Sequence, residues 1–494
     1  MQYVSTRDKA NACTASQAIL RGLASDGGLY VPDSLPCLTQ SVLDSLQDMS
    51  YPERAAFIMS LFLEDFTEEE LTAYTTAAYG PDRFDTPAVA PLHPMQDDVW
   101  CLELWHGPTC AFKDLALQML PHLLAASIRK QNEDHTVCIL VATSGDTGKA
   151  ALEGFRDVAG TKILVFYPRD GVSEVQKLQM ITQAGGNVNV CAVNGNFDDA
   201  QNGVKRIFSD AAFGESLAAK GLRLSSANSI NWGRVLPQLV YYISAWCDMR
   251  KRGELKLNPA VNICVPTGNF GNILAALYAK LIGLPVNKLI CASNSNNVLT
   301  DFLRTGIYDR NRPFHMTMSP SMDILISSNL ERLLFLLSRE NDALVRRCMK
   351  ELTETGRYEI SPAMKEHVSE LFWGGFCDEE HTAAAIRDVW EKQNYLIDTH
   401  TAVAVDVLGQ YRRETDDHTP CILASTASPF KFSDSVLRSL GEENPPAGLD
   451  AIDELGRRTG VQGPAPLCSL RGREVRFTGC VEPDGMYAPV ADMA

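Results

Sequence analysis

The sequence predicts an α/β fold in which mostly parallel strands lie between helices, and two observations support this prediction. First, short β-branched runs alternate with helical stretches from about residue 100 onward. Four of these runs are apolar at nearly every position: 137–142, 162–167, 261–265 and 288–292. Such strands need cover on both faces, as in parallel sheets. Second, two of the strands lead directly into a glycine-rich turn and a helix, which is where open α/β sheets bind ligands.

The length of 494 residues is too great for one small core, so we expect several packed units. We place an N-terminal module at 1–92, a larger α/β domain at 93–135 and 231–440, a smaller α/β domain at 136–230, and a C-terminal extension at 441–494. In the first module, Asp26-Gly27-Gly28 is expected to be a simple hairpin turn. We expect residues 301–393 to be mainly helical and to contribute to packing. The C-terminal extension is rich in Pro and Gly, and we expect it to be an irregular tail.

Composition argues against several classes of function. The 45 Lys and Arg are outnumbered by 61 Asp and Glu, a formal charge of -16, so the average surface repels nucleic acid and we expect a small-molecule partner. Fourteen cysteines without a C-x-x-C pair and nine unclustered histidines favour a reducing, cytoplasmic location and no metal site. We expect no signal peptide and no membrane segment. The sequence leaves monomer and homodimer open.

The first candidate for chemistry is Lys113, a lone lysine at the start of a helix predicted over 112–124, after a loop broken by Gly107-Pro108. The helix dipole disfavours an ammonium at this end, whereas a neutral amine that forms an imine is tolerated. Spacing alone leaves open the simpler alternative of a solvated lysine beside Asp114.

The second candidate is the turn Thr143-Ser144-Gly145-Asp146-Thr147-Gly148-Lys149, which follows the strand at 137–142 and precedes a helix expected to begin near Ala150. Glycines allow close approach of a ligand, and the free N–H groups of a helix start attract a carboxylate or a phosphate. A nucleotide-binding P-loop is not favoured, because the glycine spacing is wrong and no hydroxyl residue follows the lysine.

The third candidate is Pro266-Thr267-Gly268-Asn269-Phe270-Gly271-Asn272, between the strand at 261–265 and a helix predicted over 273–281. A helix start of this kind can hold a dianionic phosphate without a cation, so we expect Gly268, Asn269, Phe270, Gly271 and Asn272 to hold a phosphate group. A tight strand-to-helix turn without a ligand is the alternative.

The fourth candidate is Thr426, which follows the apolar run 421–424. A hydroxyl at a strand end could hydrogen-bond a pyridine nitrogen and leave it unprotonated, whereas an Asp would hold it charged. A hydroxyl that merely ends the strand is the simpler interpretation.

A lysine, two anion-binding turns and a terminal hydroxyl on one α/β scaffold meet the needs of pyridoxal 5'-phosphate, a phosphopyridine aldehyde cofactor. Their order resembles the threonine synthase family of fold-type II pyridoxal-phosphate enzymes, from residue 3 nearly to the C-terminus. Six motifs carry the resemblance: 19–32 (ILRGLASDGGLYVP), 106–114 (HGPTCAFKD), 142–148 (ATSGDTG), 194–201 (NGNFDDAQ), 228–231 (NSIN) and 266–271 (PTGNFG).

The resemblance implies that Lys113 forms the imine with the cofactor, that residues 268–272 hold it, and that Thr426 faces its ring nitrogen. Three departures bear on individual contacts. Asn272 stands where the family usually has Asp, and 428–430 reads Ser-Pro-Phe where many relatives have His-Pro-Ala. Asp146 occupies the place of an Asn that lies beside the ring hydroxyl in other fold-type II enzymes.

The resemblance also implies a reaction, the conversion of O-phospho-L-homoserine and water to L-threonine and phosphate by γ-elimination and β-hydration. Lys113 would move protons at Cα and Cβ. The leaving phosphate needs cations, and Arg234 and Lys205 are the nearest candidates, although each could instead form a surface ion pair. The expected ligands of the substrate carboxylate are Ser144, Gly145, Asp146 and Thr147.

Two alternatives remain open. A phospholyase or dehydratase acting on a related hydroxy or phospho amino acid would use the same lysine and the same turns. A non-catalytic binding protein that keeps the fold would carry no cofactor on Lys113.

Overall fold

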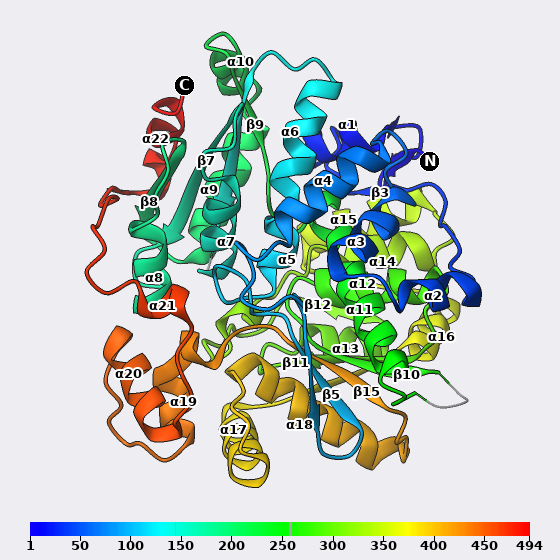
Figure 1. Ribbon diagram of the computed structural model, residues 1–494. Coiled ribbons are helices and arrows are strands. Elements are labelled where there is room, and N and C mark those ends of the chain that lie inside the picture. Colours follow the sequence, from blue (N-terminus) through cyan, green and yellow to red (C-terminus); the bar gives the residue numbers. More distant parts are fainter. Residues whose placement is uncertain (144, 256–258) are drawn as a thin grey trace.

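The computed structural model describes residues 1–143, 145–255 and 259–494, and two mostly parallel sheets with helices around them confirm the predicted α/β class (Figure 1). The larger sheet has the strand order β14-β11-β10-β15-β5-β4. Only β4 runs antiparallel to its neighbour. Its strands are β4 (Leu92–Met95), β5 (Val99–Glu103), β10 (Val261–Pro266), β11 (Val286–Ser293), β14 (Phe372–Phe376) and β15 (Cys421–Ser425).

The second sheet has the order β16-β8-β7-β6-β9, with all neighbours parallel. Its strands are β6 (Thr136–Ala142), β7 (Thr161–Pro168), β8 (Val188–Val193), β9 (Leu222–Ser225) and β16 (Cys480–Val481). All four apolar runs identified in the sequence are strands here, and their residues are almost entirely buried. The domain boundaries drawn from the sequence remain a proposal.

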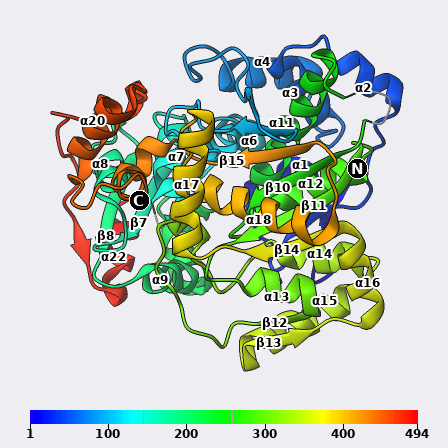
Figure 2. The same cartoon turned by 90° about the horizontal axis from the view of Figure 1, so that it is seen from below.

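Helices cover both faces of the larger sheet. The buried helix α11 (Trp232–Lys251) packs against α12 (Gly271–Leu281) on one side. On the other side, α17 (Glu379–Gln393) packs on α18 (Thr399–Thr415), which contacts four of the strands (Figure 2). The second sheet is flanked by α7 (Asp146–Phe155), α8 (Glu174–Ile181), α9 (Phe197–Ser209) and α10 (Ala211–Ala218). None of the described helices is long and apolar enough to cross a membrane.

The N-terminal module forms a three-stranded antiparallel sheet with four helices. Its elements are β1 (Tyr3–Ser5), β2 (Ala12–Cys13), α1 (Ala15–Arg21), β3 (Tyr30–Pro32), α2 (Gln40–Leu46), α3 (Tyr51–Ser60) and α4 (Glu68–Ala78). Asp26-Gly27-Gly28 is a turn, but it joins α1 to β3 and not two strands of a hairpin. The Asp26 carboxylate accepts hydrogen bonds from the Ser5 hydroxyl and the Gly28 N–H, which fixes this turn against β1.

In the second half of the chain, the mainly helical region 301–393 was predicted incompletely, and the irregular C-terminal tail was predicted wrongly. The region 301–393 contains α13 (Val298–Thr305), α14 (Leu330–Leu337), α15 (Asp342–Thr355) and α16 (Pro362–Leu371), but it also supplies β14 to the larger sheet and the hairpin β12 (Ile307–Asp309) and β13 (Arg357–Glu359). The C-terminal extension is not irregular. After α19 (Ser433–Ser439) it forms α20 (Gly448–Thr459), α21 (Ala465–Cys468), β16 and α22 (Tyr487–Ala491), and β16 adds an edge strand to the second sheet.

The helix predicted over 112–124 is divided into α5 (Lys113–Leu117) and α6 (Leu120–Lys130). Pro121 accounts for the break, since a proline ring clashes with the carbonyl four residues earlier in a continuous helix. That carbonyl belongs to Leu117, and it packs against Gly154 of α7. The close packing of α5 on α7 sets the separation of the two helix starts, Lys113 and Asp146.

Gly154 is required for this packing, and a larger residue should force α5 and α7 apart. A Cβ at Gly154 would lie 2.0 Å from the Leu117 carbonyl oxygen. We expect Gly154→Ala to lower the free energy of unfolding by about 1–3 kcal/mol, because overpacking against backbone is relieved only by backbone movement. Urea denaturation followed by circular dichroism measures the change.

The matched control is Gly214→Ala on α10, where an added Cβ meets nothing within 4 Å. Its better helix propensity should raise stability by up to about 1 kcal/mol. Equal shifts in the two variants would contradict the proposed importance of the α5–α7 contact.

Candidate active site

Lys113 is presented by a loop that folds around the buried Asp114. The Asp114 carboxylate accepts hydrogen bonds from the Thr109 N–H at 2.8 Å and the Thr109 hydroxyl at 2.7 Å. Gly107 has no room for a side chain, since a Cβ there would lie 2.6 Å from Asp114. Burial raises the pKa of Asp114 to about 6, against the lowering effect of the Thr109 hydrogen bonds. Asp114 therefore stabilises the loop through its hydrogen bonds to Thr109. It is not an exposed carboxylate that pairs with Lys113.

The Lys113 amine is held in a desolvated, charged environment. Its side chain is only 12% exposed, and its Nζ lies 3.6 Å from Asp146 Oδ2. Burial lowers the pKa of Lys113, Asp146 opposes this shift, and the cations Lys431 and Arg234 reinforce it. The solvated lysine considered as an alternative is therefore wrong. An amine with a lowered pKa is available in its neutral, nucleophilic form at lower pH than an ordinary lysine.

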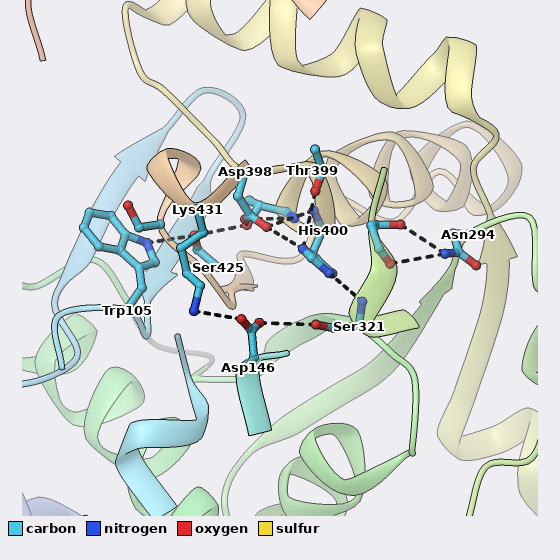
Figure 3. Close-up of polar contacts among 12 residues, drawn as sticks. Trp105, Asp146, Asn294, Ser321, Asp398, Thr399, His400, Ser425 and Lys431 are labelled. Atoms are coloured by element: carbon cyan, nitrogen blue, oxygen red, sulfur yellow. Dashed lines mark hydrogen bonds and ion pairs between the residues drawn. The ribbon is translucent and has the colours of Figure 1, made fainter. Parts of the chain in front are cut away.

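Asp146 lies at the centre of a buried polar network (Figure 3). Lys431 Nζ is 2.7 Å from its Oδ1, and Gln176 donates to the same oxygen at 2.9 Å. The Ser321 hydroxyl donates to Oδ2 at 3.3 Å. Burial alone would raise the pKa of Asp146, but the two lysines outweigh it and hold the pKa well below its usual range. The carboxylate is therefore ionised throughout the physiological pH range.

The start of α7 has a backbone shape that only glycine adopts readily. Gly145 has φ +131°, and a Cβ there would lie 2.4 Å from the Gln176 side chain. Thr143 Oγ1 accepts hydrogen bonds from the N–H groups of Gly145 and Gly148, so the helix begins at Asp146 and not near Ala150. Among the described residues of this turn, Thr147 is the one that is partly exposed. Ser144 lies outside the described residues.

The start of α12 is a second turn with a fixed backbone. Phe270 has the left-handed φ of +60° and caps the helix, while its buried ring packs against Phe372 at 5.6 Å between centroids. Phe270 therefore offers a ligand its backbone and not its ring. Gly268 is also required, since a Cβ there would lie 2.7 Å from the Ser321 carbonyl oxygen. Ser321 therefore contacts both places, since its carbonyl packs on Gly268 and its hydroxyl donates to Asp146.

Two buried amides beside α12 have the chemistry of an anion site. The Oδ1 of Asn272 accepts hydrogen bonds from Tyr241 at 2.8 Å and from Tyr242, while its Nδ2 has no partner among the described residues. The Nδ2 of Asn329 is likewise buried and without a described partner, and it lies 3.4 Å from the position of a Cβ on Gly271. Unsatisfied buried donors at a helix start fit a phosphate group.

Thr426 lies beside the lysine loop. Its carbonyl accepts a hydrogen bond from the Phe112 N–H at 2.8 Å, and the Ser428 N–H donates to the Cys110 carbonyl at 3.1 Å. The end of β15 is therefore paired with the residues that lead into α5. Two candidates that are more than 300 positions apart in the sequence are neighbours in space.

Arg234, in the first turn of α11, is a buried cation. Its Nη1 donates to the Ala227 carbonyl, its Nε has no hydrogen-bond partner among the described residues, and no carboxylate is among the groups that shift its pKa. Burial lowers its pKa to about 10, so the guanidinium is still charged at neutral pH. Lys205 is instead exposed on α9.

Sequence reasoning missed several members of this network. Lys431 follows the β15 motif in the short 3₁₀ turn Pro429–Phe432, and Ser321 lies in the turn Pro320–Met322. His400 accepts from the Ser321 N–H at 3.2 Å and is paired with Asp398, the N-cap of α18, at 2.8 Å. A lone lysine, serine or histidine in such segments carries no recognisable spacing. No group of three metal-ligating side chains occurs in the described part of the chain.

Three family descriptions match this chain in order. Residues 2–79 match "Threonine synthase N terminus", residues 83–426 match "Pyridoxal-phosphate dependent enzyme", and residues 401–466 match "Threonine synthase, C-terminal". Together they extend over most of its length.

Individual proteins that are similar to this chain indicate the same family. Threonine synthase from Pseudomonas aeruginosa is 40% identical over 479 residues, which cover 97% of this chain and 95% of that protein. Human threonine synthase-like 1 is 41% identical over 456 residues, which cover 89% of this chain but only 60% of the longer human protein. The structure of pyridoxal-phosphate-bound threonine synthase from Brucella melitensis superposes with a TM-score of 0.87 at 37% identity, covering 100% of this chain and 99% of that one.

Since the pyridoxal-phosphate description spans more than half of the chain and the Pseudomonas relative is matched over nearly its whole length, this chain belongs to the threonine synthase family of fold-type II pyridoxal-phosphate enzymes, with pyridoxal 5'-phosphate as its cofactor.

Proposed function

We propose that this protein is a threonine synthase, a carbon–oxygen lyase that converts O-phospho-L-homoserine and water to L-threonine and phosphate. The observation that carries the proposal is the desolvated Lys113 amine, 3.6 Å from Asp146 and close enough to Arg234 for that cation to lower its pKa. The match to a threonine synthase over 97% of the chain supports it. We also propose a cytoplasmic enzyme that acts as a monomer or homodimer.

The cofactor, when bound, supplies an electron sink for the negative charge that develops at the substrate Cα. The start of α12, with Gly268, Asn269, Phe270 and Gly271, would hold its phosphate through backbone N–H groups. Asn272 and Asn329 would add their free Nδ2 groups, and the Thr426 hydroxyl would hydrogen-bond the ring nitrogen. Asn at 272 suits this role, because its oxygen receives the two tyrosines while its nitrogen remains a donor.

Lys113 would carry the protons of the reaction. A lysine accepts a proton only as the neutral amine, and burial lowers the pKa of Lys113 in that direction. We infer that Lys113 removes protons from Cα and Cβ as phosphate leaves Cγ, and that protons return to Cγ and to Cα while water supplies the hydroxyl at Cβ. The lowered pKa of Lys113 is the physical basis of this repeated use.

The substrate's two anionic groups would be bound at separate places. Arg234 has a buried charge and a donor without an acceptor, so it is suited to the phosphate that leaves. The start of α7 would hold the carboxylate through the backbone N–H groups of Asp146 and Thr147 and the positive end of the helix dipole. Gly145 would permit the turn.

A phospholyase or dehydratase is the second candidate, because a protein that is called only threonine synthase-like is 41% identical to this chain. Incubation with O-phospho-L-homoserine and chromatographic analysis of the products separates the two. Threonine with an equal amount of phosphate supports the proposal. Phosphate and a keto acid without threonine would identify a lyase, and no turnover by a colourless protein would point to a binding protein.

Lys113→Ala tests the covalent attachment of the cofactor. We expect loss of the visible absorption of the bound cofactor and a fall in threonine formation of about 10³-fold or more, since the variant lacks both the attachment point and the proton carrier. Borohydride treatment of the wild-type protein should abolish the same absorption. Lys350, whose side chain is 72% exposed, offers a control, and Lys350→Ala should keep both colour and activity. Colour retained in Lys113→Ala would refute the assignment.

Arg234→Met tests the phosphate site. Loss of charge-assisted hydrogen bonds to the phosphate should raise KM for O-phospho-L-homoserine about 10- to 100-fold, while the visible absorption of the cofactor persists. Arg54→Met is the matched control. Arg54 is equally buried but is paired with Asp248 and with the Ser244 hydroxyl, so its loss should lower stability and leave KM unchanged. An unchanged KM in Arg234→Met would contradict its role.

A further inference from the structure

Two lysines share the Asp146 carboxylate, but they are not equivalent. Lys431 Nζ lies 2.7 Å from Oδ1, whereas Lys113 Nζ lies 3.6 Å from Oδ2. The shorter contact is that of a charge-assisted hydrogen bond and the longer one is not. The Lys431 side chain is also fully buried, while that of Lys113 keeps 12% exposure. Lys431 therefore holds the carboxylate, and Lys113 is the amine that a small molecule can reach.

Lys431 is fixed in place from more than one side. Its Nζ donates to the Thr109 carbonyl at 2.9 Å, in the loop that leads to Lys113. Gln176 and Ser321 donate to the two oxygens of Asp146. These donors come from α8 and from the turn Pro320–Met322, so that with the turn of Lys431 three separate segments restrain the carboxylate. It cannot rotate toward Lys113 without losing hydrogen bonds.

We propose that Lys431 is a positioning residue that neutralises Asp146 and prevents it from forming a full ion pair with Lys113. The inference rests on the proposed role of Lys113 as proton carrier. Without Lys431, the nearest charge to the Lys113 amine would be an uncompensated anion, which favours the protonated form. With Lys431 present, the amine can stay neutral and accept a proton from the substrate.

The charges that face Lys113 come from three elements. Asp146 lies on α7, Lys431 on the turn after β15, and Arg234 on α11. After burial, which has the largest effect, Asp146 raises the pKa of Lys113, and Lys431 and Arg234 lower it. Removal of Lys431 deletes one of the two cations that lower the pKa of Lys113. It also leaves Asp146, which raises this pKa, without its closest counter-charge.

The test measures the visible absorption of the cofactor-loaded protein as a function of pH. In that protein the Lys113 nitrogen lies among the same charged groups, so its protonation responds to the same changes. Lys431→Met should move the midpoint of the pH-dependent absorption change upward by about 1–2 pH units. The acid limb of the kcat profile should move the same way, because a base with a higher pKa loses its proton only at higher pH. Lys431→Arg should keep both near the wild-type values.

Asp146→Asn provides the opposite change and should move the absorption midpoint downward. In the double variant Lys431→Met/Asp146→Asn, no buried anion remains, so the midpoint should return toward that of the wild type. This pair tests the proposal even if Lys431→Met alone does not fold. A purely structural role for Lys431 predicts no rescue, and an unshifted midpoint in Lys431→Met or equal shifts in the single and double variants would overturn the inference.

The readout needs no substrate, which separates this inference from the proposed function. Shifted midpoints in a protein that forms no threonine would overturn the function and support the role of Lys431. Threonine formation with unshifted midpoints would support the proposed function and overturn the role of Lys431.

Discussion

The constraint on which the rest of the site depends is the buried ionised carboxylate of Asp146. An unpaired charge at this depth would be strongly unfavourable, so the fold must supply cations and hydrogen-bond donors around it. Lys431, Gln176 and Ser321 do so from segments that are far apart in the chain. Lys113 completes the set more loosely. The need to give one buried carboxylate its cations and hydrogen-bond donors therefore places three parts of the chain together. These are the proposed catalytic amine, the turn Pro320–Met322 that packs on Gly268, and the residues after β15.

The packing of helices gives this network its dimensions. Pro121 ends α5 early, the freed Leu117 carbonyl faces Gly154, and α5 and α7 approach until no side chain fits between them. Lys113 and Asp146 are the first residues of these two helices. A change of packing at Gly154, a full helix length away from Asp146, is therefore transmitted to the Lys113–Asp146 contact through rigid elements.

The sequence predicted the parts of the site that follow a repeated local rule. Apolar strands that end in glycine turns indicated the starts of α7 and α12, and both are helix starts at strand ends in the structure. The position of Lys113 at a helix start left a solvated lysine open, and the two glycine turns together with the family resemblance singled it out. Lys431, Ser321 and His400 were not recognisable, because their roles depend on which segments tertiary folding brings together. The same limit explains β14 and β16, short strands that take part in sheets formed by distant residues.

Local charge, and not net charge, governs the ligands that this site selects. The protein carries a formal charge of -16, yet the groups around the proposed reaction centre are three cations and one carboxylate. Exposed charges more than about 8 Å away are largely screened at physiological ionic strength, whereas buried ones are not. An anionic cofactor and the proposed anionic substrate would thus meet a positive site inside an acidic protein. Since Lys431 cancels Asp146, the charge left over is that of Lys113 and Arg234. With the Lys113 amine neutral, Arg234 alone would provide the positive charge for the leaving phosphate of the proposed reaction.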